Sequence, residues 1–186
     1  HPNTASKVEN ILDDLRNFIQ QNKNNQLPGA AIVFLALTGG NPDGKNWEKL
    51  SEPKGKLSAG VTDFASFIER QLQQRVSIYH GNMEMKEPCA EDDVDNHSKP
   101  LGNMHGRSRR SEQTKFIRGE NHIMVATKGF GMGIDKENVR LIIHRTPPAN
   151  LEAYAQEAGR AGRDGQPAEV ILYYSPDAPK EDNGYG

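Results

Sequence analysis

The sequence predicts an α/β fold in which a mostly parallel β-sheet is covered by helices on both faces. Short apolar runs typical of strands alternate along the 186 residues with segments whose apolar residues have helical spacing. Strands that alternate with helices are typical of parallel sheets buried between two helical layers. Two long polar stretches, about 38–60 and 84–107, interrupt this pattern, so we expect them to be insertions on a compact core.

The first helix is predicted to begin at Ser6, because Ser6 and Glu9 have the spacing of a capping box and apolar residues then recur at i, i+3 and i+4. The apolar, partly β-branched run Ala30–Leu37 predicts a buried strand. A second amphipathic helix is expected over about 64–72, leading into a strand at 75–79.

The second half repeats the alternation. Asn150 is a favourable N-cap for a helix that carries Leu151, Tyr154 and Ala158. The other elements expected here are a helix near 111–118 and strands at 122–126, 139–144 and 169–174.

Composition excludes several classes of protein. A mass of 20.6 kDa fits one domain, which we place at 1–176, with a disordered tail at 177–186. The mean hydropathy of −0.79 and a longest apolar run of eight residues exclude a membrane span, which needs about 18–20. The single cysteine, Cys89, excludes an internal disulfide framework. We expect a soluble intracellular protein without a signal peptide. Because the chain does not start with Met, we expect a piece of a longer protein.

The net charge of −2 conceals an uneven distribution. Segment 84–95 has six acidic residues and one lysine, a local charge of −5, which leaves the rest of the chain at +3. Segment 107–118 carries a local +4. The acidic segment is either a flap that masks a basic nucleic-acid-binding rim or a solvated loop.

Three motifs are weak candidates. Gly39–Lys45 has the GxxxxGK pattern of a phosphate-binding loop, but Asn46 replaces the Mg²⁺-binding Ser/Thr, so a flexible loop is favoured over a nucleotide hydrolase that uses Lys45. The glycines of 129–133 do not complete GxGxxG in either register. The potential metal ligands Cys89, His97 and His105 match no compact site, and we predict no metal centre.

Two segments are stronger candidates for phosphate binding. Gln156 and Arg160 are one helical turn apart with Arg163 just beyond, and paired guanidiniums suit phosphate oxygens. The alternative is a basic helix end with glycine C-caps. Thr127 closes a strand and opens a turn of three glycines whose bare amides can hold phosphate. The alternative there is a tight strand-to-helix connection.

The run from Arg109 to Tyr174 resembles the second RecA-like lobe of RecQ-type superfamily 2 DNA helicases. VATKGFGMGIDK (125–136) resembles motif V, QEAGRAGRDG (156–165) resembles motif VI, and YHGNM (79–83) resembles the family's YHAGM. AIVFLAL (31–37) stands in the place of motif IV. The resemblance implies a RecA-like, P-loop NTPase-type three-layer domain that is the C-terminal motor lobe of an ATP-dependent DNA helicase or translocase.

The resemblance also implies site residues. Arg163 would be the arginine finger that reaches the γ-phosphate of ATP, and Arg160 would contact the phosphates or an acidic motif of the opposing lobe. The other implied ATP-binding residues are Gln156, Asp135 and Gly133. The implied DNA-binding residues are Thr127, Lys128 and Gly131, with His80, Gly81 and Arg109 on the same rim.

The implied partners are single-stranded or duplex DNA and an N-terminal RecA-like lobe. That lobe would hold most of the ATP and Mg²⁺, so the chain alone is expected to be inactive as an ATPase. The location would be cytoplasmic, at the nucleoid, in a bacterium and nuclear in a eukaryote. The alternative function is a DNA-binding or interaction lobe of a repair or defence complex that does not unwind DNA.

Overall fold

The computed structural model describes residues 4–23, 29–36, 60–83, 100–104, 106–127 and 135–174. Most of the two expected insertions and the expected tail lie outside these residues, so the predicted domain limits, insertions and acidic flap remain predictions.

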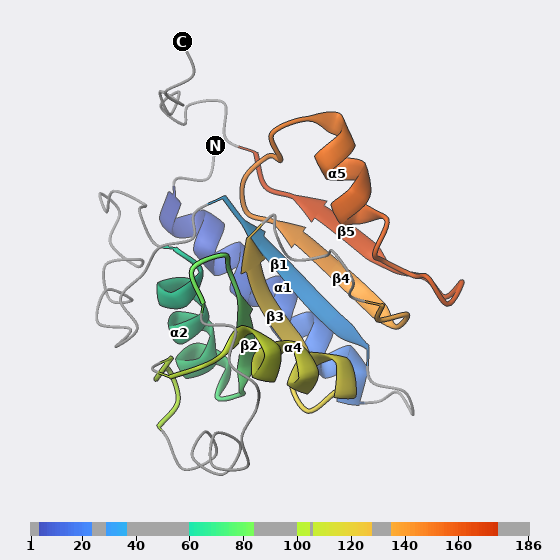
Figure 1. The fold of residues 1–186 in the computed structure, drawn as a ribbon. Coiled ribbons are helices and arrows are strands. Elements are labelled where there is room, and N and C mark those ends of the chain that lie inside the picture. Colours follow the sequence, from blue (N-terminus) through green and yellow to red (C-terminus); the bar gives the residue numbers. More distant parts are fainter. Residues whose placement is uncertain are drawn as a thin grey trace.

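The described residues form a five-stranded, fully parallel sheet in the order β2-β3-β1-β4-β5 (Figure 1). The strands are β1 (Ala30–Leu35), β2 (Val76–Tyr79), β3 (Ile123–Thr127), β4 (Val139–His144) and β5 (Glu169–Leu172). The helices among these residues are α1 (Thr4–Lys23), α2 (Val61–Leu72), α4 (Arg109–Arg118) and α5 (Leu151–Ala158). The expected α/β class is confirmed.

The sheet separates two apolar clusters. On one face, α1 and α2 pack against alternate strand residues such as Val33 and Val125. On the other face, Phe116 of α4 and Ala161, just beyond α5, pack against the intervening residues such as Ile32. Burying one large apolar side chain of this kind contributes about 1.5–3 kcal/mol. The three-layer arrangement follows from strands whose two faces are both apolar.

The N-terminal caps of the helices agree with the sequence predictions in some places and not in others. Asn150 caps α5 as expected, since its side-chain oxygen accepts from the backbone N–H of Ala153 at 2.8 Å. Ser108 caps α4 by accepting from Ser111, which starts that helix two residues earlier than expected. The capping box at Ser6 is wrong, because α1 already begins at Thr4. Nothing before Ser6 in this helix breaks it, as proline or glycine would.

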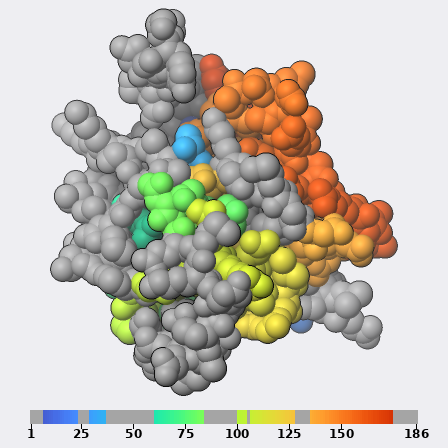
Figure 2. Space-filling model, viewed as in Figure 1, coloured from blue at the N-terminus to red at the C-terminus, as the bar shows by residue number. Residues whose placement is uncertain are grey.

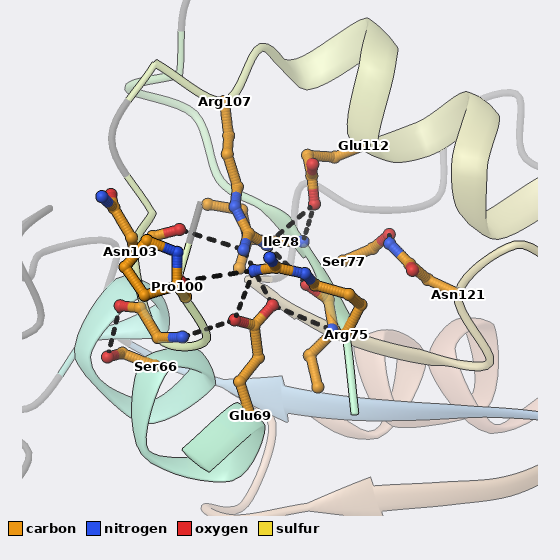
Figure 3. Close-up of polar contacts among 12 residues, drawn as sticks. Ser66, Glu69, Arg75, Ser77, Ile78, Pro100, Asn103, Arg107, Glu112 and Asn121 are labelled. Carbon is orange, nitrogen blue, oxygen red and sulfur yellow. Dashed lines mark hydrogen bonds and ion pairs between the residues drawn. The ribbon is translucent and has the colours of Figure 1, made fainter. Parts of the chain in front are cut away.

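Side chains seal the outer edge of β2. A carboxylate oxygen of Glu69 (α2) accepts from the N–H of Val76 at 3.0 Å, and one of Glu112 (α4) accepts from the N–H of Ile78 at 3.1 Å. The guanidinium of Arg107 donates to the carbonyl of Val76 at 2.7 Å (Figure 3). These groups take the place of a neighbouring strand, which protects an edge that would otherwise accept another chain.

The sealing groups also pair with one another (Figure 3). Arg107 lies 2.8 Å from a carboxylate oxygen of Glu69 and 3.4 Å from one of Glu112, and all three side chains are buried. Burial raises the pKa of Glu112, an effect that the charge of Arg107 opposes. Glu69 also accepts from the N–H of Gly102 at 2.7 Å, so the network fixes segment 100–104 to the edge.

Candidate functional site

The arginine-rich segment is a turn that follows α5. The N–H of Gly159 still donates to the carbonyl of Ala155, as in an α-helix, but the N–H of Arg160 donates to Glu157, three residues back. The backbone therefore tightens into a 3₁₀-type turn at this point. Arg160 thus lies beyond the end of the helix, and the expectation that it sits one helical turn after Gln156 is wrong in this detail.

The arginine turn, defined here as residues 159–165, is held against the beginning of β4. The N–H of Gly162 donates to the carbonyl of Val139 at 2.9 Å. Arg140 forms a two-point ion pair with Asp164, with one contact of 2.9 Å. Paired contacts between a guanidinium and a carboxylate fix orientation as well as position. The first two residues of β4 therefore set where the turn lies.

Gly162 is required by this geometry. Its φ is +63°, and a Cβ at this position would lie 2.8 Å from the carbonyl oxygen of Gln166. We expect Gly162→Ala to lower the free energy of unfolding by at least about 1–2 kcal/mol, the backbone cost of a left-handed alanine. Gly165→Ala is the matched control, because Gly165 has φ +76° but open space around a Cβ. Urea unfolding of both variants measures the difference, and equal losses would contradict the close contact at Gly162.

Arg163 reaches an acidic residue that precedes β4. Its guanidinium lies 3.0 Å from a carboxylate oxygen of Asp135, with 37% of the Arg163 side chain and 79% of the Asp135 side chain exposed. An exposed ion pair contributes about 0–1 kcal/mol, so this contact is readily exchanged. The Nε of Arg163 donates to the carbonyl of Gly159 at 3.4 Å. In Figure 2 the orange and red segments, which include α5 and the arginine turn, protrude at the upper right of the molecule.

The charge of Arg163 affects the pKa of Arg160. Partial burial lowers the pKa of Arg160, the charge of Arg163 lowers it further, and Glu157 opposes both effects. The guanidinium of Arg160 nevertheless remains charged at neutral pH, because arginine has an intrinsically high pKa. Two like charges at the surface favour binding of a polyanion between them.

A second cluster lies at the carboxyl ends of β2 and β3. His80 and Gly81 follow β2 directly, and the pairing of Tyr79 with Ala126 brings His80 beside Thr127. Arg109 donates to the carbonyls of Gly81 and Met83 at 2.5 and 3.2 Å. Its guanidinium also lies 5.5 Å from the centre of the Tyr79 ring. The structure thus brings His80, Gly81 and Arg109 together.

The side chains of this cluster differ in accessibility. Burial and the charge of Arg109 lower the pKa of His80, so its ring is neutral at pH 7. Thr127 is only 5% exposed, so little of its surface is accessible to a ligand in this structure. Lys128, Gly131 and Gly133 lie outside the described residues, as do the GxxxxGK segment, Cys89, His97 and His105. The ligand-binding roles expected for Lys128, Gly131 and Gly133 therefore remain predictions. The same is true of the expectation that the GxxxxGK segment is a loop and that Cys89, His97 and His105 bind no metal.

Two other kinds of feature are absent from the described segments. No three His, Cys, Asp or Glu side chains within them gather closely enough to hold a metal ion. None of their helices combines the length and the apolar character that a bilayer crossing needs.

The two clusters lie at opposite ends of the parallel strands. Ligands of parallel α/β sheets usually bind at the carboxyl ends of the strands, where the His80 cluster lies, but the arginine turn lies beside the start of β4. The reason is that α5 begins after the carboxyl end of β4 and runs back along the sheet. A motif at the end of such a helix arrives at the amino ends of the strands.

Two buried polar groupings could not be predicted from the sequence. One is the Glu69–Arg107–Glu112 network, and the other is a contact between His144 and Glu157. The only sequence indication of the second is a histidine at the end of the apolar run VRLIIH, on the same face of the strand as Ile142.

Comparison with known proteins gives consistent results. The model of the helicase conserved C-terminal domain matches residues 56–165. A Caenorhabditis briggsae protein named putative ATP-dependent DNA helicase Q1 is 34% identical over 183 residues, covering 92% of this chain and 27% of that protein. The ATP-dependent DNA helicase RecQ of Bacillus subtilis is 52% identical over 68 residues, which are 37% of this chain and 12% of that protein. The chain thus spans about a quarter or less of the length of these relatives.

Solved structures share the fold at lower identity. The Mss116p DEAD-box helicase domain 2 bound to an RNA duplex has a TM-score of 0.53 and 18% identity, covering 91% of this chain and 50% of that chain. A Pyrococcus furiosus Hef helicase domain has a TM-score of 0.51 and 18% identity, covering 93% of this chain and 26% of that chain. The RecA-like fold expected above is confirmed.

Proposed function

Because the chain belongs to the helicase conserved C-terminal domain family and is related to RecQ-family ATP-dependent DNA helicases, we propose that it works as the second motor lobe of an ATP-dependent DNA helicase. In this proposal the ATP site is shared with an N-terminal RecA-like lobe. The observation that carries the proposal is the surface pair Arg160 and Arg163, held on a turn that β4 fixes at several points.

Arg163 acts as the arginine finger in this proposal. Its present partner is the carboxylate of Asp135, which has the same charge sign and a similar oxygen geometry to a phosphate. When the lobes close on ATP, the γ-phosphate replaces Asp135 as its partner. Phosphoryl transfer spreads negative charge over the transferred group, and an arginine supplied from another domain contributes about 10³–10⁵-fold in rate.

The remaining ATP contacts are assigned by position. Arg160 lies on the same turn and approaches the phosphates or an acid of the opposing lobe, while Gln156 lies on the adjoining end of α5. We assign Mg²⁺ to the opposing lobe, together with most of the nucleotide. A Mg²⁺ ion there would neutralise part of the phosphate charge, and the guanidiniums of this lobe supply the rest.

The rim formed by His80, Gly81 and Arg109 is assigned to DNA. Arg109 keeps the 81–83 turn in place and adds positive charge next to a neutral histidine. Contacts of this kind hold the phosphate backbone and do not read bases, so affinity should fall steeply with salt. A location with the DNA, in the nucleus or at the nucleoid, follows from the same proposal.

ATP hydrolysis by this chain alone and by the full-length protein, with and without single-stranded DNA, tests the proposal. We expect no turnover by the chain alone and DNA-stimulated turnover by the full-length protein, because half of the site is supplied by the other lobe. Turnover by the chain alone that Lys45→Ala abolishes would contradict it and would identify the GxxxxGK segment as the active site. DNA binding without any turnover by the full-length protein would favour the interaction-lobe alternative.

A further inference from the structure

His144 and Glu157 form a buried contact between the sheet and α5. His144 is the last residue of β4 and is fully buried, and its Nδ1 lies 3.2 Å from a carboxylate oxygen of Glu157. Its ring stacks on Phe34 with centroids 5.4 Å apart and an interplanar angle of 16°. The ring of Tyr154 lies against it, also at 5.4 Å. Both neighbouring rings hold the imidazole in one orientation.

Glu157 is the only buried side chain of α5. The first residue of the helix, Leu151, is 80% exposed, so the helix offers the sheet little apolar surface. Apolar contacts are not directional and would allow a helix to rotate or slide. The 3.2 Å contact does not have hydrogen-bond geometry, but both groups are buried, and moving them apart would leave each without a polar neighbour at a cost in free energy. The contact with His144 therefore sets how α5 is rotated about its own axis.

The same glutamate is joined to the arginine turn. The carbonyl of Glu157 accepts from the N–H of Arg160 at 3.3 Å. Arg163 in turn donates to the carbonyl of Gly159, two residues beyond Glu157. A rotation of α5 that moved Glu157 would therefore move both guanidiniums. The contacts of Val139 and Arg140 hold the other end of the turn, so such a rotation would shift the arginines without detaching them.

We propose that His144 is a positioning residue for the arginine finger: its contact with Glu157 fixes α5 in the orientation that places Arg160 and Arg163 on the phosphates of ATP. This inference rests on the proposed function. A displacement of about 1 Å at a reacting group can cost about 10²-fold in rate. A positioning residue of this kind should act mainly on kcat, because an arginine finger makes its contact most strongly in the transition state.

The test uses DNA-stimulated ATP hydrolysis by the full-length protein. His144→Phe keeps an aromatic ring between Phe34 and Tyr154 but removes the nitrogen that faces Glu157. We expect kcat to fall about 10- to 100-fold, with KM for ATP changed less than about threefold. Glu157→Met removes the other partner of the contact and should lower kcat by a similar factor. The double variant should be no slower than either single one, because both remove one contact.

A conservative variant and a control variant separate a positioning effect on kcat from a general loss of folding or stability. His144→Gln keeps a side-chain N–H that can donate to Glu157 and should recover most of the lost kcat. Leu151→Ala changes an exposed residue of the same helix and should leave kcat unchanged. Thermal unfolding of each variant reports whether the fold is intact. If His144→Phe does not fold, Glu157→Met decides by the same criterion.

Arg163→Ala in the same assay separates the proposed function of the lobe from the positioning role of His144. Full activity of Arg163→Ala would overturn the proposed function. A loss of activity in Arg163→Ala, together with native kcat in folded His144→Phe or Glu157→Met, would overturn the positioning role alone. Independent, additive losses in the double variant would also overturn it.

Discussion

Replacing Arg163 with alanine is expected to lower DNA-stimulated ATP hydrolysis by the full-length protein about 10³- to 10⁵-fold. The side chain is partly exposed and makes one weak ion pair, so its loss should change the stability of the lobe very little. Steady-state hydrolysis at saturating DNA measures the effect on kcat. Binding of single-stranded DNA, measured by fluorescence anisotropy, should stay within about threefold, because the arginine turn and the His80 rim lie at opposite ends of the strands.

Arg16→Ala is the matched control for this variant. Arg16 is also an exposed arginine paired with an aspartate, at 2.8 Å from Asp13, but it lies on α1. Its removal deletes the same charge and should leave hydrolysis unchanged. Equal activity of Arg163→Ala and Arg16→Ala would show that Arg163 does not contact the transferred phosphate, and the assignment of the arginine turn would then be wrong.

Replacing Arg107 with methionine is expected to lower the free energy of unfolding by about 3–5 kcal/mol. The substitution leaves Glu112 as a buried carboxylate without the guanidinium that it contacts, and it leaves Glu69 with only the contact to Arg75 at 3.4 Å. It also removes the donor to the carbonyl of Val76. Urea unfolding of this chain, followed by circular dichroism, measures the loss. The sheet edge at β2 should also become able to pair with another molecule, which size-exclusion chromatography would detect.

Two further variants test this explanation. Arg118→Ala removes an arginine that is 69% exposed and 3.9 Å from Glu120, and it should change stability by less than about 0.5 kcal/mol. Adding Glu69→Gln and Glu112→Gln to Arg107→Met removes the uncompensated charges and should recover part of the loss. No recovery in the triple variant would mean that packing at position 107, and not charge, accounts for the effect.

The strands could be predicted from the sequence because each is a short run of apolar residues that needs no partner to be recognised. Val139–His144 was predicted to the residue, and the others to within two residues of their described ends. Asn150 was likewise identified as a cap from its position alone. These features depend on residues that are neighbours in the chain.

Features that depend on distant residues could not be predicted in the same way. Glu69 and Arg107 are 38 positions apart, and nothing local indicates that they meet at the edge of β2. The position of the arginine turn depends on the direction in which α5 runs along the sheet, which the motif itself does not encode. Ser6 shows the opposite error, since its local pattern fits a cap but the helix extends past it.

The separation of the arginine turn from the His80 rim has a mechanical consequence. Both are attached to one close-packed sheet, whose strands have four to six residues and therefore span about 13–20 Å. In the proposed motor we expect the lobe to turn as a rigid lever without bending between the two sites. A tilt of about 10° at the nucleotide end would then sweep the opposite end through about 3 Å, close to the roughly 3.4 Å between successive nucleotides along one strand of B-DNA. In the proposed motor, the length of the strands would therefore convert a small angular motion at the arginine turn into a displacement of about one nucleotide at the His80 rim.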